Sequence, residues 1–137
     1  ITINEGKELE RIEGYQAYLD AGIEIIAGGH PDELFERDFD FVVKNPGINY
    51  DVPLVKAAED KKIPVIVEIE LAGEIANAKL IGVTGSNGKT TTTTMIAEML
   101  NAGNEKGKAY RAGNIGISAT KVAEKATSND EIVMELS

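Results

Sequence analysis

Short apolar runs alternate with amphipathic stretches along most of the chain. Runs rich in Ile, Val and Phe predict β-strands at residues 2–4, 23–27, 39–43, 63–67, 80–83 and 131–136. Helical spacing of apolar residues, with Pro and Gly near the ends of the stretches, predicts helical segments at residues 7–19, 31–36, 52–60 and 90–102. Because Val- and Ile-rich strands that alternate with helices are typical of sheets buried on both faces, the pattern predicts an α/β fold with a parallel sheet.

The pattern changes character between residues 68 and 77. Three glutamates, Glu68, Glu70 and Glu74, interleave there with apolar residues, as in a connecting segment that is partly helical. We expect these carboxylates to form a solvated face. A new strand begins near Lys79, so we predict two domains, at residues 1–77 and 78–137.

Both ends of the sequence lie at predicted strands. The chain opens with Ile1-Thr2-Ile3, without an initiator methionine, and it stops just after the apolar run at residues 132–136. A core strand is normally followed by a further element of its domain. We therefore expect the sequence to be a fragment of a longer protein.

Composition narrows the classes of function. The 137 residues carry a formal net charge of -9, which disfavours non-specific binding to nucleic acid because such binding needs basic patches. No apolar stretch reaches the roughly 18 residues of a membrane-spanning helix, and the first residues do not resemble a signal peptide. With no cysteine, the sequence has no disulfide or thiolate metal site, which agrees with a cytoplasmic location. We expect neither nucleic acid nor membrane as a partner.

The strongest chemical signal is Thr84-Gly85-Ser86-Asn87-Gly88-Lys89-Thr90, between a predicted strand and a predicted helix. Glycines let successive backbone N–H groups turn inward and form an anion-binding concavity at a helix N-terminus. In such a loop Lys89 reaches the β- and γ-phosphates, and the Thr90 hydroxyl coordinates magnesium. The usual pattern G-x-x-x-x-G-K-[ST] is present only in its second half, because Val83 stands where the first glycine would be. We nevertheless predict a phosphate-binding loop.

Two more residues are candidates by position. Thr91 follows the loop closely enough to contact a phosphate oxygen, but it can equally be an ordinary helix residue, which is how we interpret Thr92 to Thr94. Glu135 lies near the carboxyl end of a predicted strand, where ligands gather in open α/β sheets. It either helps to hold magnesium or is an exposed glutamate just past the strand, and position alone leaves both interpretations open.

Three other polar segments have a simple structural interpretation when each is taken alone. The turns Asn45-Pro46-Gly47 and Gly113-Asn114-Ile115-Gly116 consist of residues that are common in any turn. His30, the only histidine, follows Gly28-Gly29 and has no carboxylates at ligand spacing. We therefore interpret it as a surface residue and assign no metal to it.

Taken together, these segments resemble the Mur ligase family, whose members extend peptidoglycan precursors one amino acid at a time. The loop at residues 84–90 is similar to that family's variant of the phosphate loop, including its missing early glycine. Three further segments resemble the member that adds D-glutamate: Asn45-Pro46-Gly47-Ile48, Gly113-Asn114-Ile115-Gly116 and Met134-Glu135-Leu136-Ser137. The likeness follows the order of the whole chain, but it covers well under half of the family's length.

The resemblance implies a role for each matching position. It places residues 1–77 in a UDP-binding domain with a Rossmann-like parallel sheet, and residues 78–137 in the front of a P-loop-type α/β ATPase domain. It implies ATP binding by Gly85, Ser86, Asn87, Gly88, Lys89, Thr90 and Thr91, a magnesium site at Thr90 and Glu135, and catalytic roles for Lys89 and Glu135. It implies substrate binding by Glu5 at the uridine, by Asn45, Pro46 and Gly47 at the UDP moiety, and by Asn114 near the muramoyl group. Many relatives have serine at the position of Asn45.

The implied reaction uses ATP and Mg²⁺ to join D-glutamate to UDP-N-acetylmuramoyl-L-alanine through an acyl phosphate. The family's third domain and remaining catalytic residues would lie beyond Ser137, so we expect the 137 residues alone to be inactive. Three alternatives remain open. They are another Mur-type or folylpolyglutamate-type ligase, a nucleotide-binding switch with a similar loop, and a non-catalytic module that retains only the loop.

Overall fold

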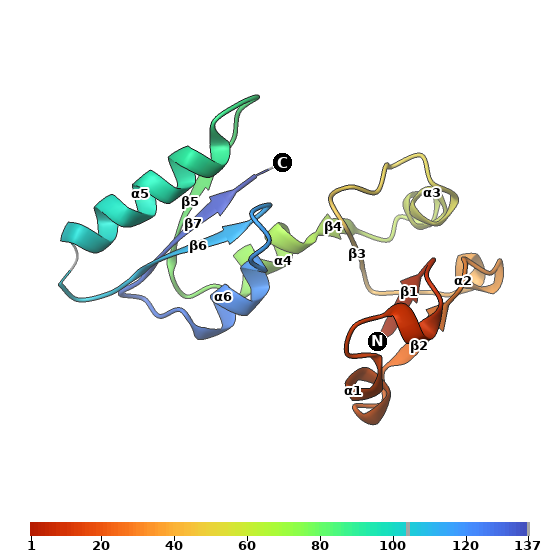
Figure 1. Cartoon of the computed structure of the whole chain (residues 1–137). Coiled ribbons are helices and arrows are strands. Elements are labelled where there is room, and N and C mark those ends of the chain that lie inside the picture. Colours follow the sequence, from red (N-terminus) through yellow and green to blue (C-terminus); the bar gives the residue numbers. More distant parts are fainter. Residues whose placement is uncertain (104, 137) are drawn as a thin grey trace. The chain divides into compact units, whose positions relative to one another are not determined.

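The computed structural model describes residues 1–103 and 105–136. The chain divides into two compact units (Figure 1). Unit 1 comprises residues 1–40 and 50–64, and unit 2 comprises residues 41–49 and the chain from residue 65 onward. Compactness thus groups residues 65–77 with the later strands, and the domain boundary that we predict at residue 77 stays a prediction.

Unit 1 contains one parallel pair of strands and several short helices. Strand β1 (Thr2–Glu5) pairs with β2 (Glu24–Ala27) in the register from Thr2↔Glu24 to Glu5↔Ala27. The helical elements are the 3-10 helix η1 (Leu9–Arg11), α1 (Tyr15–Asp20), α2 (Glu33–Glu36) and α3 (Pro53–Asp60). Its buried apolar residues are Leu34, Val55 and Ala58.

The prediction of a single helix at residues 7–19 is wrong. The structure has η1 and α1 in its place, separated by Gly14, whose φ of 74° lies in the left-handed region. A left-handed residue cannot continue a right-handed helix, so the helix ends there despite the apolar spacing on either side.

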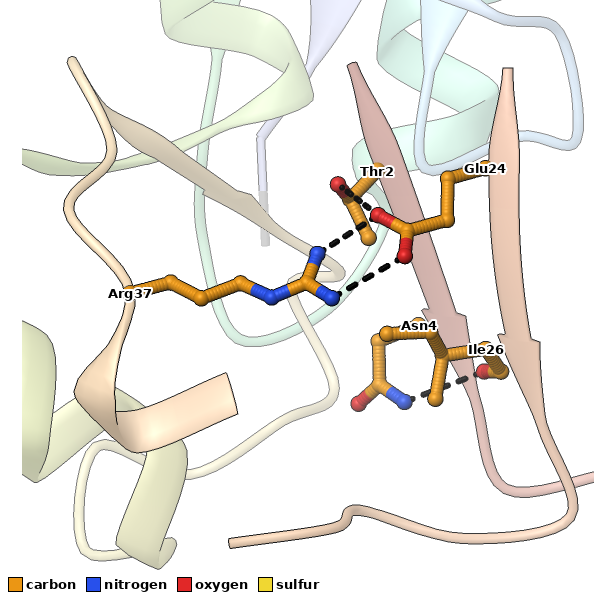
Figure 2. Close-up of polar contacts among 5 residues, drawn as sticks. All are labelled: Thr2, Asn4, Glu24, Ile26 and Arg37. Atoms are coloured by element: carbon orange, nitrogen blue, oxygen red, sulfur yellow. Dashed lines mark hydrogen bonds and ion pairs between the residues drawn. The ribbon is translucent and has the colours of Figure 1, made fainter. Parts of the chain in front are cut away.

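Polar contacts join the strands and loops of unit 1 (Figure 2). The Glu24 carboxylate accepts hydrogen bonds from the Arg37 guanidinium at 2.5 and 3.0 Å and from the Thr2 hydroxyl at 2.8 Å. The Arg37 contact, followed by that of Thr2, lowers the pKa of Glu24 to about 2. The Asn4 amide nitrogen donates to the carbonyl oxygen of Ile26 at 3.1 Å. It also donates to the carbonyl oxygen of Gly29 at 2.8 Å.

Unit 2 contains a second parallel pair and a three-stranded parallel sheet. The pair is β3 (Val42–Lys44) with β4 (Val65–Val67), and helix α4 (Glu68–Ile75) follows β4 directly. The sheet has the order β5-β7-β6, with β5 (Lys79–Val83), β6 (Ala109–Gly113) and β7 (Glu131–Glu135). Helices α5 (Lys89–Gly103) and α6 (Ala119–Lys125) complete the unit.

The sheet of unit 2 is buried on both faces, as predicted. Ile132 and Met134 of β7 pack on one face with residues of α4 and α6, whereas Val133 packs on the other face with Ala97 of α5 (Figure 1). This separation follows from the strand geometry, because successive side chains of a strand point to opposite faces. The parallel α/β class is therefore confirmed. Within the described ranges, none of the helices combines the length and apolar character that a membrane crossing requires.

Two elements of unit 2 were not predicted from the sequence. Strand β6 (AYRAG) lacks β-branched residues and contains two alanines and a glycine, so its composition does not predict a strand. Helix α6 had a usable signal. Ser118 caps its N-terminus by accepting a hydrogen bond from the Lys121 N–H, and Ala119, Val122 and Ala123 are buried at helical spacing.

Candidate functional site

The phosphate-loop segment lies between β5 and α5, which is the context predicted for it (Figure 1). Gly85 has φ 148° and Gly88 has φ 75°, values that side-chain-bearing residues rarely adopt. The Lys89 ammonium donates a hydrogen bond to the Gly85 carbonyl oxygen at 2.8 Å, so this side chain folds back over the loop. The glycines thus give the loop its shape, and the lysine lies above it.

A pocket of about 320 Å³ opens at this loop. Its lining residues are Ser86, Asn87, Gly88, Lys89, Thr90, Thr91 and Glu135. Glu135 comes from β7, which lies beside β5 in the register Val83↔Glu135. The parallel strands therefore bring Glu135 and the loop after Val83 to the same end of the sheet. The pocket thus brings together six predicted residues of the loop segment and Glu135, which lies 44 residues beyond Thr91.

Glu135 is the most informative residue of the pocket. Its side chain is only 4% exposed, and its Oε2 atom has no hydrogen-bond partner in the structure. The interpretation of Glu135 as an exposed glutamate is therefore wrong. A buried carboxylate oxygen without a partner is costly, unless a cation or another donor meets it. The arrangement fits a divalent cation, which prefers carboxylate and hydroxyl oxygens such as those of Glu135 and Thr90.

The described residues contain no cluster of three or more His, Cys, Asp or Glu side chains that could hold a metal by themselves. A cation at Glu135 and Thr90 would therefore need further oxygen ligands beyond these two side chains. Phosphate oxygens of a nucleotide in the loop can supply such ligands.

The Gly113–Gly116 turn adjoins this end of the sheet. The Asn114 N–H donates to the Glu135 carbonyl oxygen at 3.1 Å, and the Gly113 N–H donates to the Ile117 carbonyl oxygen at 2.8 Å. A Cβ atom at Gly113 would lie 2.5 Å from the Glu135 carbonyl oxygen, and the residue has φ 94°. Glycine is therefore required here because the two backbones approach closely, and not only because the residue lies in a turn.

The Asn45–Ile48 segment forms a closed turn at the end of β3. The Asn45 side-chain oxygen accepts from the Gly47 N–H at 3.0 Å, and the Asn45 carbonyl oxygen accepts from the Ile48 N–H at 2.9 Å. Lys44, which is only 6% exposed, donates from Nζ to the Ile48 carbonyl oxygen at 2.9 Å. Sequence reasoning missed Lys44. A lysine next to a turn motif at the end of an apolar strand is the signal that was available.

The other predicted substrate residues do not line the pocket. Asn45, Pro46 and Gly47 belong to unit 2 but do not line the pocket, and neither does Asn114. Glu5 lies in unit 1 at the carboxyl end of β1 and accepts a hydrogen bond from the Lys7 N–H at 3.3 Å. Their roles stay predictions. His30 is exposed, with its ring Nδ1 hydrogen-bonded to the Asn4 side-chain oxygen, in agreement with a surface position.

Glu68 does not lie on a solvated face, and that expectation is wrong for this residue. Its carboxylate is partly buried and accepts hydrogen bonds from Ser118 and Thr120. Glu74 does lie exposed on α4. The interleaving of glutamates with apolar residues could not distinguish the two, because the partner of Glu68 comes from 50 residues further along the chain.

Comparison with known proteins gives matches over the whole chain. Residues 83–137 match the model of the Mur ligase middle domain. The full 137 residues are 53% identical to UDP-N-acetylmuramoylalanine–D-glutamate ligase of Streptococcus pyogenes serotype M49, 51% to that of Enterococcus faecalis and 54% to that of Lactiplantibacillus plantarum. In each case the match includes all of this chain but only 30% of the relative.

A solved structure from Neisseria meningitides is also similar, namely UDP-N-acetylmuramate:L-alanyl-gamma-D-glutamyl-meso-diaminopimelate ligase. It is 21% identical, with a TM-score of 0.48, and the match covers 95% of this chain and 44% of that one. The sequence matches carry the assignment, since they extend from the first residue to the last and include the phosphate loop and Glu135. Over its whole length the chain is therefore similar to Mur ligases, and its residues 83–137 match their middle domain.

Proposed function

We propose that this chain is part of an ATP-dependent ligase that adds D-glutamate to UDP-N-acetylmuramoyl-L-alanine. The observation that carries the proposal is the pocket in which Lys89 and Thr90 meet a buried carboxylate oxygen of Glu135 that lacks a partner. Relatives with 51–54% identity bear the name of that ligase. Because the chain spans 30% of their length, the activity is proposed for a longer protein that contains this sequence.

In this proposal the loop residues bind the phosphates of ATP. Backbone N–H groups at residues 85–91 face the phosphate oxygens, and Lys89 exchanges its contact with the Gly85 carbonyl oxygen for one with the β- and γ-phosphates. Thr90 and Glu135 would hold Mg²⁺, which supplies positive charge that offsets the repulsion between the two anionic reactants. Lys89 contributes charge of the same sign.

The reaction that these groups support is phosphoryl transfer followed by amide formation. An oxygen of the L-alanine carboxylate attacks the γ-phosphorus, and the bond to ADP breaks. The D-glutamate amine then attacks the acyl carbon, loses a proton, and inorganic phosphate leaves with the electrons of the C–O bond. No nucleophile from the protein is needed, so the task of the chain is to bind, orient and offset charge.

The proposal also includes the substrate contacts and domains implied by the resemblance. Glu5, Asn45, Pro46 and Gly47 would contact the UDP moiety, and Asn114 the muramoyl group. Two observations support a role for Asn45, Pro46, Gly47 and Asn114. Both of their turns follow the carboxyl end of a strand of unit 2. Both turns are also held by hydrogen bonds, from the backbone or from the Asn45 side chain. The boundary near residue 77 would separate the substrate domain from the ATPase domain.

Phosphate release tests the proposed reaction. A full-length protein containing this sequence should release phosphate from ATP only when UDP-N-acetylmuramoyl-L-alanine and D-glutamate are both present. Release with a different amino acid would retain the ligase and reject the specificity. Release that needs neither substrate would favour a nucleotide-binding switch.

Titration of Mg–ATP into Lys89→Ala tests the loop. We expect the affinity to fall roughly tenfold to a hundredfold, because a hydrogen bond to a charged group contributes about 1.5–3 kcal/mol. Lys56→Ala is the matched control, since Lys56 is an exposed helical lysine of unit 1. Equal affinities for Lys89→Ala and the control would refute the assignment of Lys89.

A further inference from the structure

Glu68 connects two parts of unit 2 that are distant in the sequence. Its Oε1 atom accepts hydrogen bonds from the Thr120 N–H at 2.7 Å, the Thr120 hydroxyl at 2.7 Å and the Ser118 hydroxyl at 2.8 Å. Glu68 is the first residue of α4, whereas Ser118 and Thr120 lie at the start of α6. One carboxylate oxygen therefore joins the beginnings of two helices.

The hydrogen-bond donors around Glu68 favour the ionised form of its carboxyl group. Burial raises the pKa of this carboxyl group, but the hydrogen bonds from Thr120 and Ser118 lower it by more, and the pKa lies below its ordinary value. The group is therefore ionised at neutral pH, and its three contacts are charge-assisted hydrogen bonds, which are stronger than neutral ones.

On the α6 side, the contacts continue to the phosphate pocket. Helix α6 follows the turn in which the Gly113 N–H donates to the Ile117 carbonyl oxygen at 2.8 Å. In the same turn the Asn114 N–H donates to the carbonyl oxygen of Glu135, whose side chain lines the pocket. The start of α6 is thus fixed to the carboxyl end of β7.

On the α4 side, the contacts continue to the Asn45–Ile48 turn. Glu68 directly follows Val67, the last residue of β4, and Val67 pairs with Lys44 of β3. The buried Lys44 side chain then donates to the Ile48 carbonyl oxygen at 2.9 Å. The end of β4 is thus fixed to the Asn45–Ile48 turn.

We propose that Glu68 is a positioning residue that sets the Asn45–Ile48 turn at a fixed distance from the phosphate pocket. This inference rests on the proposed function, in which the turn binds the nucleotide part of the substrate and the pocket binds ATP. A ligase needs such a constraint, because the substrate must reach from its binding turn to the γ-phosphate with its carboxylate aligned. A small change in this distance would weaken substrate binding without altering the loop that binds ATP.

Apolar packing holds the two helices together. Ala72 of α4 and Ala119, Val122 and Ala123 of α6 belong to one buried cluster, so the helices remain attached without Glu68. Several of these side chains are small, so apolar burial specifies the alignment of the two helices less tightly than three short hydrogen bonds to one oxygen do. Glu68 therefore determines the alignment of α4 on α6 rather than their attachment.

Three variants of the full-length ligase test the proposal. Glu68→Ala removes the acceptor, Glu68→Gln retains an oxygen that can accept from Ser118 and Thr120, and Thr120→Val removes one donor at nearly constant volume. Glu74→Ala is the control, because Glu74 is an exposed glutamate of the same helix. For Glu68→Ala we expect KM for the UDP-linked substrate to rise roughly tenfold, which corresponds to about 1.4 kcal/mol. The Kd for Mg–ATP should stay within about twofold, and Gln should restore most of the loss.

Amide hydrogen exchange on the same variants gives a readout independent of activity. Glu68→Ala should speed exchange several-fold at the amides of residues 45, 47, 48 and 114–118 and leave the amides of β5, β7 and β6 unchanged, and Thr120→Val should do the same to a smaller extent. Unchanged exchange and unchanged KM in Glu68→Ala would overturn the proposal. A parallel loss of ATP affinity and of protection throughout the sheet would also overturn it, because it would show a general structural role. If the wild type lacks D-glutamate-dependent phosphate release but the exchange changes occur, the proposed function fails while the coupling by Glu68 stands.

Discussion

Units 1 and 2 are built from the same kind of parallel strand pairing, yet they are stabilised differently. In unit 2 the residues of β7 are buried by α5 on one face and by α4 and α6 on the other. In unit 1 the residues of β1 and β2 are only partly buried or exposed, and the contacts at their edges are polar. Burial of apolar area is the main favourable term in folding, whereas exposed polar contacts contribute little. Unit 2 therefore provides a well-buried base for the phosphate pocket.

The largest expected effect is the loss of a core side chain from unit 2. Ile132→Ala removes a side chain that is 1% exposed, and such substitutions typically lower the free energy of unfolding by about 2–5 kcal/mol. Ile25→Ala in the partly buried β2 should have a clearly smaller effect. Urea unfolding of both variants measures the difference. Equal losses would show that the two units have comparable cores.

A glycine substitution should sharpen the same contrast. Gly113→Ala in unit 2 combines an unfavourable φ of 94° with a Cβ atom 2.5 Å from the Glu135 carbonyl oxygen. Gly22→Ala in unit 1 has a similar φ of 74° but no atom within 4 Å of the added Cβ. We expect a loss of about 1–3 kcal/mol for Gly22→Ala and a larger one for Gly113→Ala, measured by thermal unfolding. A smaller loss at Gly113 would contradict the close backbone approach.

Acid should weaken unit 2 through two carboxylates. The pKa of Asp130 is lowered by hydrogen bonds from the Thr127 N–H, the Lys108 N–H and the Thr127 hydroxyl, and that of Glu68 is also lowered. Because both folded-state pKa values lie below the unfolded ones, their contribution is complete above the unfolded values, near pH 4–4.5, and is lost as the pH falls through the folded values. Unfolding free energies measured from pH 6 to pH 3 should fall, and Asp130→Asn should show a shallower fall. An unchanged slope in this variant would exclude Asp130 as a cause.

The smallest expected effect is at the surface of unit 1. Arg37→Ala removes the exposed ion pair with Glu24 and should raise the pKa of Glu24 from about 2 toward its ordinary value. The stability at pH 7 should change little, because surrounding water and salt screen such pairs. NMR titration of Glu24 measures the pKa shift, with Lys56→Ala as a control in the same unit. A large loss of stability would mean that the polar contacts of unit 1 replace a core.

Local sequence signals were sufficient for much of the fold and part of the site. The β–α alternation, strand β7 and the strand–loop–helix context of Lys89 could be predicted because each depends on contiguous residues. The phosphate loop is a contiguous motif whose glycines and lysine carry their chemistry with them. The helix predicted at residues 7–19 failed for the opposite reason. The apolar spacing predicts one continuous helix, but it carries no information on the left-handed backbone of Gly14, which interrupts the helix.

The sequence by itself thus determined the loop, the fold class and the family resemblance, whereas the tertiary structure decided what surrounds the loop. Burial of Glu135 with an unpartnered oxygen depends on the pairing of β7 with β5, and the contacts of Glu68 depend on residues 50 and 52 positions away. Strand β6 has little β-propensity of its own and is held in place by its pairing with β7. Such features arise from packing between distant segments, and packing follows from the whole fold because a contact across many residues has no local signature.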